Sequence, residues 1–296
     1  MSHPARTVGI VGLGLVGSAV AARLREAGFA VAGYDPRPAA TAALMQAGGT
    51  PLASAAAVGA MARLVFVAVF DTVQVEQAVE GAQGLMQARP RPGYIVNLAT
   101  ADPERIAALA ARLEQTDVAL IEAPLSGSST QIAAGTASML LGGTRAAIDA
   151  CAEELAAITP MRLHVGAAGM GARAKLATNL VLGLNRAALA EGMVFAERLG
   201  IAPEKFLELV LHSPARSFAA ETRGAQMAAG DTTPVSRIAQ HLKDVEMMLD
   251  YAGAANQRLP FSEVHAALMR AAVATGDGEL DNTAIVRQLR RETPAT

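Results

Sequence analysis

Two polar residues in the middle of the chain have the types and spacing that suit acid–base chemistry. Only three lysines occur among the 25 basic residues, and one of them, Lys175, follows Gly169-x-Gly171 and precedes Asn179 by four residues. A lysine ammonium can give up its proton, which an arginine cannot do. The Ala- and Leu-rich run predicts a helix on which both side chains share one face. They are therefore candidate catalytic residues, although an exposed Lys–Asn pair on a surface helix has the same pattern.

A glycine-rich motif near the start of the chain is typical of a dinucleotide-binding loop. It follows a Val/Ile-rich run and opens an Ala-rich run, which is the strand–turn–helix context that such a loop requires. Its first glycine permits a tight turn, its second lets the backbone approach a pyrophosphate, and its third allows close helix–strand packing. The helix N-terminus then offers N–H groups to the phosphates. We expect the whole motif to bind the cofactor: Gly12, Leu13, Gly14, Leu15, Val16 and Gly17.

Asp35 ends the next predicted strand, 21 residues after Gly14. A carboxylate there can accept hydrogen bonds from the ribose hydroxyls and repels a 2′-phosphate, so it favours NAD over NADP. Arg37 keeps NADP open, because an arginine can neutralise that phosphate. A plain turn after a strand is the alternative interpretation of Asp35-Pro36.

The elements that would position these residues alternate in type through the first half. Short Val/Ile/Leu-rich runs alternate with Ala-rich helical runs: Val8–Val11, Gly17–Glu26, Ala30–Tyr34, Ala39–Ala47, Leu64–Val69, Tyr94–Leu98, Pro103–Leu113 and Val118–Ile121. This order predicts an α/β fold with a parallel, doubly wound Rossmann sheet. After about Val165 only helical patterns remain, among them a long run from Ala172 to Leu199.

We therefore predict two domains joined by a long helix. Residues 1–165 would be the NAD(P)-binding Rossmann domain, and residues 166–296 an all-helical domain for substrate binding and oligomerisation. The Ala/Leu/Met-rich helical half suggests a homodimer or homotetramer. We expect the terminal segment Arg290–Thr296 to be unstructured.

Composition excludes several classes of protein. A hydrophobic fraction of 52% with 18% charged residues supports a sizeable core, and a net charge of -2 attracts neither nucleic acid nor an anionic membrane. One cysteine, Cys151, rules out an intrachain disulfide, and no Cys/His pair has metal-ligand spacing. The longest apolar stretch, Pro51–Phe70, is interrupted by polar residues and predicts a short helix and a strand, not a membrane span. The short polar start leaves no room for a signal peptide, so we expect a cytoplasmic protein.

Four segments, in this order and spacing, resemble the β-hydroxyacid dehydrogenase family, which includes 3-hydroxyisobutyrate dehydrogenase and tartronate semialdehyde reductase. They are Gly12–Gly17; Glu122-Ala-Pro-Leu-Ser-Gly-Ser128 with Ala134–Thr136 and Leu141–Gly143; Gly169–Asn179; and Lys243-Asp244. The resemblance implies a Rossmann domain and a helical C-terminal domain like that of 6-phosphogluconate dehydrogenase. It also implies an oxidoreductase that moves a hydride between NAD(P) and a small β-hydroxy acid or its semialdehyde.

The resemblance further implies residue roles. Lys175 would be the general acid/base that stabilises and protonates the developing alkoxide, and Asn179 would orient the substrate hydroxyl or the lysine. Ser126, Gly127 and Ser128 would hold the substrate carboxylate, although a plain Gly/Ser turn after a strand has the same pattern. The cofactor would also contact residues after two further strands and one in the helical half: Val69, Phe70, Thr100 and Lys243.

Departures from the family pattern leave the substrate open. The loop reads Ser-Gly-Ser where Ser-Gly-Gly is common, Glu122 stands where Asp is usual, and Ser236 stands where many relatives have phenylalanine. A larger or more polar hydroxy acid is one alternative, such as tartronate semialdehyde, an aldonate or a β-hydroxy amino acid. An imine reductase usually lacks the lysine, and a non-catalytic dinucleotide-binding module would tend to lose both Lys175 and Asn179.

Overall fold

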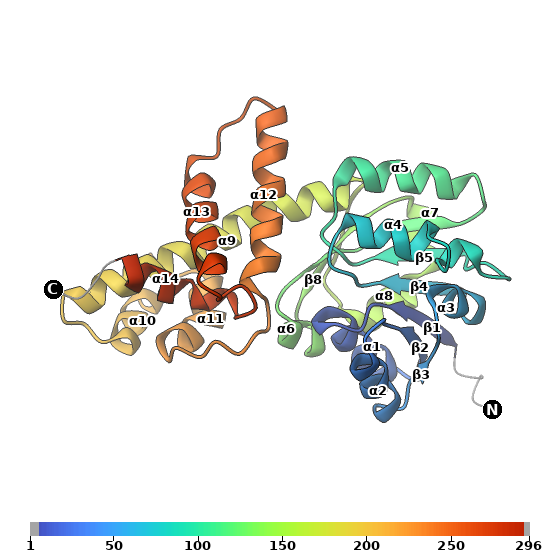
Figure 1. The fold of residues 1–296 in the computed structure, drawn as a ribbon, viewed down its shortest axis with the longest axis horizontal. Helices are drawn as coiled ribbons and strands as arrows, with labels where there is room; N and C mark the ends of the chain where they lie inside the picture. Colours follow the sequence, from blue (N-terminus) through green and yellow to red (C-terminus); the bar gives the residue numbers. More distant parts are fainter. Residues whose placement is uncertain (1–5, 293–296) are drawn as a thin grey trace. The chain divides into compact units, whose positions relative to one another are not determined.

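The computed structural model describes residues 6–292. They form two compact units, the first ending at Lys175 and the second beginning at Leu176. The first unit is an α/β fold and the second is helical (Figure 1). The predicted fold class, a Rossmann-type fold followed by helices and including one long helix, is confirmed.

Within the described residues, the first unit is built around a nine-stranded sheet. The strands are β1 (Thr7–Val11), β2 (Ala30–Tyr34), β3 (Thr50–Pro51), β4 (Leu64–Val67), β5 (Tyr94–Asn97), β6 (Ala119–Glu122), β7 (Leu125–Ser126), β8 (Ser138–Gly142) and β9 (Arg162–Gly166). They lie in the order β3-β2-β1-β4-β5-β6-β8-β7, with β9 paired to β8. Strands β1 to β6 are parallel, so their carboxyl ends share one edge. The strand order reverses between β1 and β4, which is where open α/β sheets bind ligands.

Helices cover both faces of this sheet. They are α1 (Leu15–Glu26), α2 (Pro38–Gln46), α3 (Ala55–Met61), α4 (Thr72–Glu80), the 3-10 turn η1 (Leu85–Gln87), α5 (Pro103–Glu114), α6 (Ser129–Ala133), α7 (Arg145–Ala150) and α8 (Ala152–Ile158). In β4, Phe66 packs into a core with α1, α7 and α8, whereas Val65 and Val67 pack into a second core with α3, α4 and α5. Both faces of the strand are therefore apolar, as the sequence pattern predicts.

The sheet is mixed, which differs from the predicted parallel sheet. Strand β8 runs antiparallel to both β6 and β7. The connection between Ser126 and Ser138 holds only the five-residue helix α6, which is too short for the crossover that a parallel return requires. Strand β7 spans two residues, so it leaves almost no periodic signal in the sequence.

The second unit is built from helices around one core. Helix α9 (Met170–Arg198) begins in the first unit and continues into the second, and it is followed by α10 (Pro203–Leu211), α11 (Phe218–Ala228), α12 (Ile238–Ala254), α13 (Pro260–Ala274), the 3-10 turn η2 (Asn282–Ala284) and α14 (Ile285–Glu292). Buried Met193, Met248 and Met269 join α9, α12 and α13 in this core. The long helix predicted over Ala172–Leu199 is confirmed, with bounds that differ by two residues at its start and one at its end.

The prediction of an unstructured end from Arg290 is wrong as far as Glu292. Arg290 Nε lies 3.0 Å from a carboxylate oxygen of Glu197 on α9, and Arg291 Nη2 lies 2.8 Å from Asp277 Oδ2. These ion pairs, with two buried apolar residues at the start of α14, hold the last turn in place. Residues 293–296 of that prediction lie outside the described residues.

Candidate functional site

The glycine motif forms the turn between β1 and α1 at the carboxyl edge of the sheet. Gly12 has a φ of 93°, a conformation that favours glycine, and a Cβ there would lie 2.4 Å from the carbonyl oxygen of Ala68. A Cβ on Gly17 would lie 1.9 Å from the carbonyl oxygen of Gly12. A Cβ on Gly14 would meet only Arg37, at 3.7 Å. Gly14, the N-cap of α1, has no side chain to cap the helix, and the first turn carries no acidic residue, so the start of this helix suits an anion.

Asp35 is buried at the end of β2, and its carboxylate accepts four hydrogen bonds. Leu13 N and Arg37 Nη2 donate to Oδ2 at 2.8 and 2.7 Å, and Arg37 N and Nε donate to Oδ1 at 2.9 and 2.8 Å. Burial raises the pKa of the Asp35 carboxyl, but the hydrogen bonds from Arg37 and Leu13 outweigh it and bring the pKa below its usual value. The pair thus places an anion and a cation beside the glycine turn.

The residues that follow β4 and β5 lie along the same edge. Val69 Cγ1 is 3.2 Å from the place of a Cβ on Gly12, so it borders the glycine turn, and Phe70 is exposed beside it. Asn97 ends β5, and its side chain bonds to the backbone two residues on, which shapes the turn that carries half-buried Thr100. Contact of these residues with a cofactor stays a prediction.

The Ser126-Gly127-Ser128 loop connects β7 to α6. Gly127 has a φ of 154°, and a Cβ there would lie 2.9 Å from the Cβ of Ala137. Ser128 Oγ accepts the N–H of Gln131 at 3.3 Å, and Gln131 Oε1 accepts the N–H of Ser128 at 2.8 Å. This capping box gives Ser128 a local structural role at the start of α6. Its role as a substrate ligand stays a prediction.

Lys175 is buried in the second turn of α9, with 6% of its surface exposed. The first turn of that helix is held by Glu122, the last residue of β6. Glu122 Oε1 accepts the N–H of Ala172 at 3.0 Å and Oε2 accepts the N–H of Gly169. Burial raises the pKa of the Glu122 carboxyl, and the hydrogen bonds from Ala172, Gly169 and Gly171 oppose that rise. The buried ammonium therefore lies on a helix that starts at the carboxyl edge of the sheet.

In the second unit, Asp244 joins two of the predicted site residues. Asn179 is buried on α9, and its Nδ2 donates to Asp244 Oδ2 at 3.2 Å. Lys243 Nζ, on α12, lies 3.0 Å from Asp244 Oδ1. Asp244 is itself buried, so the two side chains that it holds have little freedom to turn.

Comparison with known proteins places the chain in a family. Residues 7–169 match the family described as the NAD binding domain of 6-phosphogluconate dehydrogenase, and residues 169–289 match the NAD-binding family of NADP-dependent 3-hydroxyisobutyrate dehydrogenase. L-threonate dehydrogenase of Cupriavidus necator is 32% identical over 283 residues, which cover 95% of each chain. The chain belongs to the β-hydroxyacid dehydrogenase family.

Two further relatives agree with this assignment. The dehydrogenase is 27% identical to the 2-hydroxy-3-oxopropionate reductase of Escherichia coli, over 95% of this chain and 96% of that protein. It matches the crystal structure of 3-hydroxyisobutyrate dehydrogenase from Salmonella typhimurium with a TM-score of 0.87 at 27% identity, over 95% and 99% of the two chains. The predictions of the family, of an NAD(P)-dependent oxidoreductase and of a hydroxy acid as its class of substrate are confirmed.

Some contacts of the dehydrogenase were not apparent from the sequence pattern. The four bonds on Asp35 include three from Arg37, which the sequence suggested only as a partner for a 2′-phosphate. Glu122 caps α9 from 47 residues away along the chain, and Asp244 reaches Asn179 from 65 residues away. In the sequence, Glu122 and Asp244 stand out only because they belong to the family segments, and this does not indicate which residues they contact.

The cysteine and the one lysine that lie outside the family segments have structural roles in the dehydrogenase. Cys151 is buried, and burial raises the pKa of its thiol to about 12, so it is unreactive. Exposed Lys205 pairs with Glu208 on α10 at 2.8 Å.

Within residues 6–292, no group of three His, Cys, Asp or Glu side chains could hold a metal ion. No helix in the same range is long and apolar enough to cross a membrane.

Proposed function

We propose that the enzyme interconverts a small β-hydroxy acid of the 3-hydroxyisobutyrate type and its semialdehyde, with Lys175 as general acid/base. The burial of Lys175 carries this proposal. A lysine with 6% of its surface exposed costs free energy to bury, and such residues concentrate at functional sites. Its helix is capped by Glu122, which lies at the carboxyl end of β6, the same sheet edge as the glycine turn.

The residues of the chain would divide the chemistry as follows. NAD(P), bound on the Gly12–Gly17 turn, supplies the hydride acceptor or donor. In reduction, the Lys175 ammonium stabilises the negative charge that develops on the substrate oxygen and delivers the proton; in oxidation, its neutral amine removes the hydroxyl proton. Asn179, oriented by Asp244, donates a hydrogen bond to the same oxygen, and the Ser126–Ser128 loop holds the carboxylate.

A substrate panel tests the proposal. Absorbance of reduced nicotinamide would be followed with NAD and NADP against 3-hydroxyisobutyrate, L-threonate, glycerate, 3-hydroxypropionate and phenylserine, with tartronate semialdehyde and a cyclic imine in the reducing direction. We expect one hydroxy acid to be turned over strongly. L-Threonate is the second candidate, because the Cupriavidus necator relative that acts on it is 32% identical. Binding of reduced nicotinamide without turnover of any compound would favour a non-catalytic module, and turnover of the imine alone an imine reductase.

We also propose that NAD is the preferred cofactor and NADP the weaker one. The carboxylate of Asp35 is buried and fixed by Leu13 N, so it stays in place to repel a 2′-phosphate. The Arg37 side chain is 61% exposed, so it can turn toward a phosphate and offset part of that repulsion. The ratio of kcat/KM for NAD and NADP measures the preference, and a ratio below one would contradict it.

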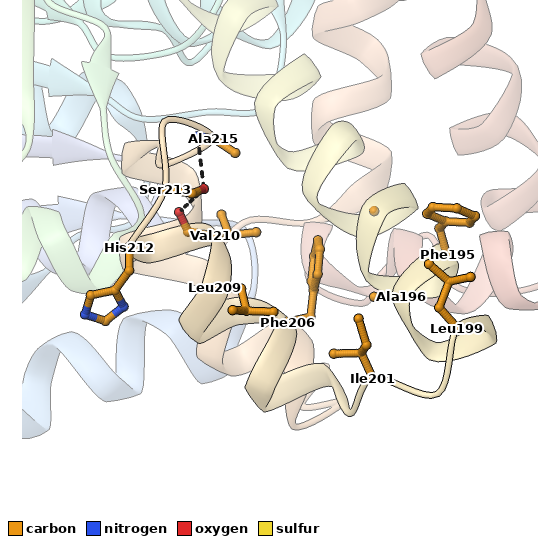
Figure 2. A pocket seen from close by; sticks show the side chains of 11 residues that line it. Phe195, Ala196, Leu199, Ile201, Phe206, Leu209, Val210, His212, Ser213 and Ala215 are labelled. Atoms are coloured by element: carbon orange, nitrogen blue, oxygen red, sulfur yellow. Dashed lines mark hydrogen bonds between the residues drawn. The ribbon is translucent and has the colours of Figure 1, made fainter.

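We propose further that the protein is a homodimer or homotetramer. Figure 2 shows an apolar groove of the second unit, between the end of α9 and α10, which is lined by Phe195, Leu199, Ile201, Phe206, Leu209 and neighbouring residues. Phe195 and Leu199 are 64% and 61% exposed. Apolar side chains gathered in this way are typical of a surface that a second copy covers. Light scattering should give a dimer or tetramer that Phe195→Glu dissociates and Met45→Glu, on α2, does not; a monomeric wild type would contradict the proposal.

The division of labour between the two halves belongs to the same proposal. Residues 1–165 would bind the cofactor, and residues 166–296 would supply substrate contacts and the assembly surface. The division of the chain into compact units near this point supports it. We also propose that the enzyme is cytoplasmic, which cell fractionation would check.

A further inference from the structure

Helix α9 begins without a capping side chain of its own. The residue before it, Gly169, has a φ of 91°, and a Cβ there would lie 2.9 Å from the carbonyl oxygen of Pro103. Glycine is therefore required at the position where Ser, Thr or Asp usually caps a helix. The first N–H groups of a helix have no partner within it, so another element has to supply one.

Glu122 supplies that partner from the sheet. Its two carboxylate oxygens accept the N–H groups of Gly169 and Ala172. Two glycines leave just enough room for it. A Cβ on Gly142 would lie 2.4 Å from Glu122 Oε2, and a Cβ on Gly171 would lie 2.9 Å from Glu122 Cβ. The carboxylate is 1% exposed, so the start of α9 can neither slide nor rotate without a clash or a lost hydrogen bond.

The contacts of Glu122 are those of an ionised carboxylate. Both oxygens act as acceptors, whereas a protonated carboxyl would turn one O–H against a backbone donor. Burial keeps the pKa of the Glu122 carboxyl above its usual value, whereas the hydrogen bonds from the helix and the charge of Arg173 favour the charged form. A negative charge at this point offsets the partial positive charge of the helix N-terminus.

We infer that Glu122 is a positioning residue for Lys175, which it sets in place through α9. Gly171 and Lys175 are four residues apart and share one face of the helix, so the face that is locked against Glu122 also carries the lysine. Glu122 also balances the positive end of the helix one turn before that lysine. The inference rests on the proposed role of Lys175, and it explains why glycine occurs at 142 and 171.

Three variants of the full-length enzyme test this inference. Glu122→Gln keeps the size of the side chain and removes its charge, and Glu122→Asp keeps the charge. Glu154→Gln is the matched control, because Glu154, on α8, is also buried in the first unit but pairs with Arg63, at 3.6 Å. For each variant, kcat, KM, the affinity for NADH, the pH dependence of oxidation and the folded fraction by circular dichroism would be measured.

We expect Glu122→Gln to lower kcat by roughly 10- to 100-fold, since a misplacement of about 1 Å can cost that much. NADH affinity should be unchanged, because the glycine turn lies on another strand. The rise of oxidation rate with pH should move about 0.5 pH unit lower, because the unbalanced helix end makes a nearby lysine easier to deprotonate. Glu122→Asp should keep the wild-type pH profile, and Glu154→Gln both kcat and the profile.

Two outcomes would overturn the inference. One is a Glu122→Gln variant with wild-type kcat. The other is a loss of activity that follows the folded fraction while the pH profile stays in place, which would mark a purely structural role. Lys175→Ala in parallel separates the two proposals: if it stays active, the proposed function fails together with the inference. If Lys175→Ala is inactive and Glu122→Gln is normal, only the inference fails.

Discussion

In the first unit, the predicted site residues depend on backbone N–H groups and on glycines, whereas in the second unit buried side chains bond to one another. Asp35 accepts Leu13 N, and Glu122 accepts Ala172 N. Asn179, by contrast, is held by the carboxylate of Asp244. A backbone donor is present whatever side chain follows it, so the first arrangement is built into the turn. The second arrangement is lost when any one of its side chains is replaced.

The second unit extends this kind of contact into a buried polar cluster. Burial lowers the pKa of the Arg186 guanidinium to about 10, with Asp281 and Asp244 acting against the shift. The rings of His241 and His265 lie 5.4 Å apart, and a Cβ on Gly183 would lie 2.4 Å from His241 Nε2. Such a cluster is sensitive to substitution, because a buried polar group that loses its partner lowers the free energy of unfolding.

The largest effect on activity is expected from replacing Lys175, the last residue of the first unit. Lys175→Ala should lower kcat by roughly 10²- to 10⁴-fold, as general acid/base catalysis contributes that much, while NADH binding survives. Lys175→Arg should not restore turnover, because arginine cannot release a proton. Lys205→Ala, which removes an exposed lysine, is the control. Steady-state kinetics and a fluorescence titration of NADH give both quantities, and loss of NADH binding would show that Lys175 is not purely catalytic.

In the second unit, the side-chain contacts of Asn179 and Lys243 both depend on Asp244. Asp244→Asn removes the charge that holds Asn179 and Lys243, so we expect kcat/KM to fall by about tenfold or more through misorientation. Asp250→Asn removes an exposed carboxylate from the same helix and serves as the control, with activity within about twofold of wild type. If both variants behave alike, Asp244 does not position these residues.

Substitutions in the Asp35–Arg37 pair of the first unit test the proposed preference for NAD over NADP. Arg37→Ala should lower kcat/KM for NADP by about tenfold and change NAD little, because a charged hydrogen bond to phosphate is lost. Asp35→Asn should shift the ratio toward NADP by a similar factor. Parallel assays of each variant with both cofactors measure the two ratios. Unchanged ratios in both variants would mean that neither side chain reaches the ribose.

A separate effect concerns stability in acid. Burial, and then the charge of Arg186, lower the pKa of His265 from 6.5 to about 4. Because the folded-state pKa is depressed, this stabilisation is complete above pH 6.5 and is lost as the pH falls toward 4, by up to about 1.4 kcal/mol per unit. Urea unfolding at pH 7, 5.5 and 4.5 should show a smaller acid loss in His265→Gln than in the wild type. Exposed His212→Gln should behave like the wild type, and equal losses in all three proteins would contradict the assignment.

The same difference between the units explains what could be predicted from the sequence. The Gly12–Gly17 turn depends on neighbours in the chain, so its spacing was sufficient to predict it, and β2 has the bounds that its apolar run predicts. The antiparallel direction of β8 could not be predicted, because the chain reaches it through β7, a two-residue strand that is too short to show alternating apolar and polar residues. The contacts of Glu122 and Asp244 span 47 and 65 residues, and no local pattern encodes which carboxylate meets which donor. Spacing in the sequence thus predicted the glycine turn, but it predicted neither of these long-range contacts, whether with a backbone donor or with a side chain.

The central claim is that hydride passes directly between a hydroxy acid and the nicotinamide ring of the cofactor that the glycine turn binds. The most direct test uses the acid that the panel identifies, with deuterium on the carbon that bears the oxidised hydroxyl, and mass spectrometry of the reduced cofactor. We expect one deuterium on the nicotinamide ring of every cofactor molecule reduced by the wild type. A reduced cofactor that carries only hydrogen, or no reduction with any acid of the panel, would contradict the account.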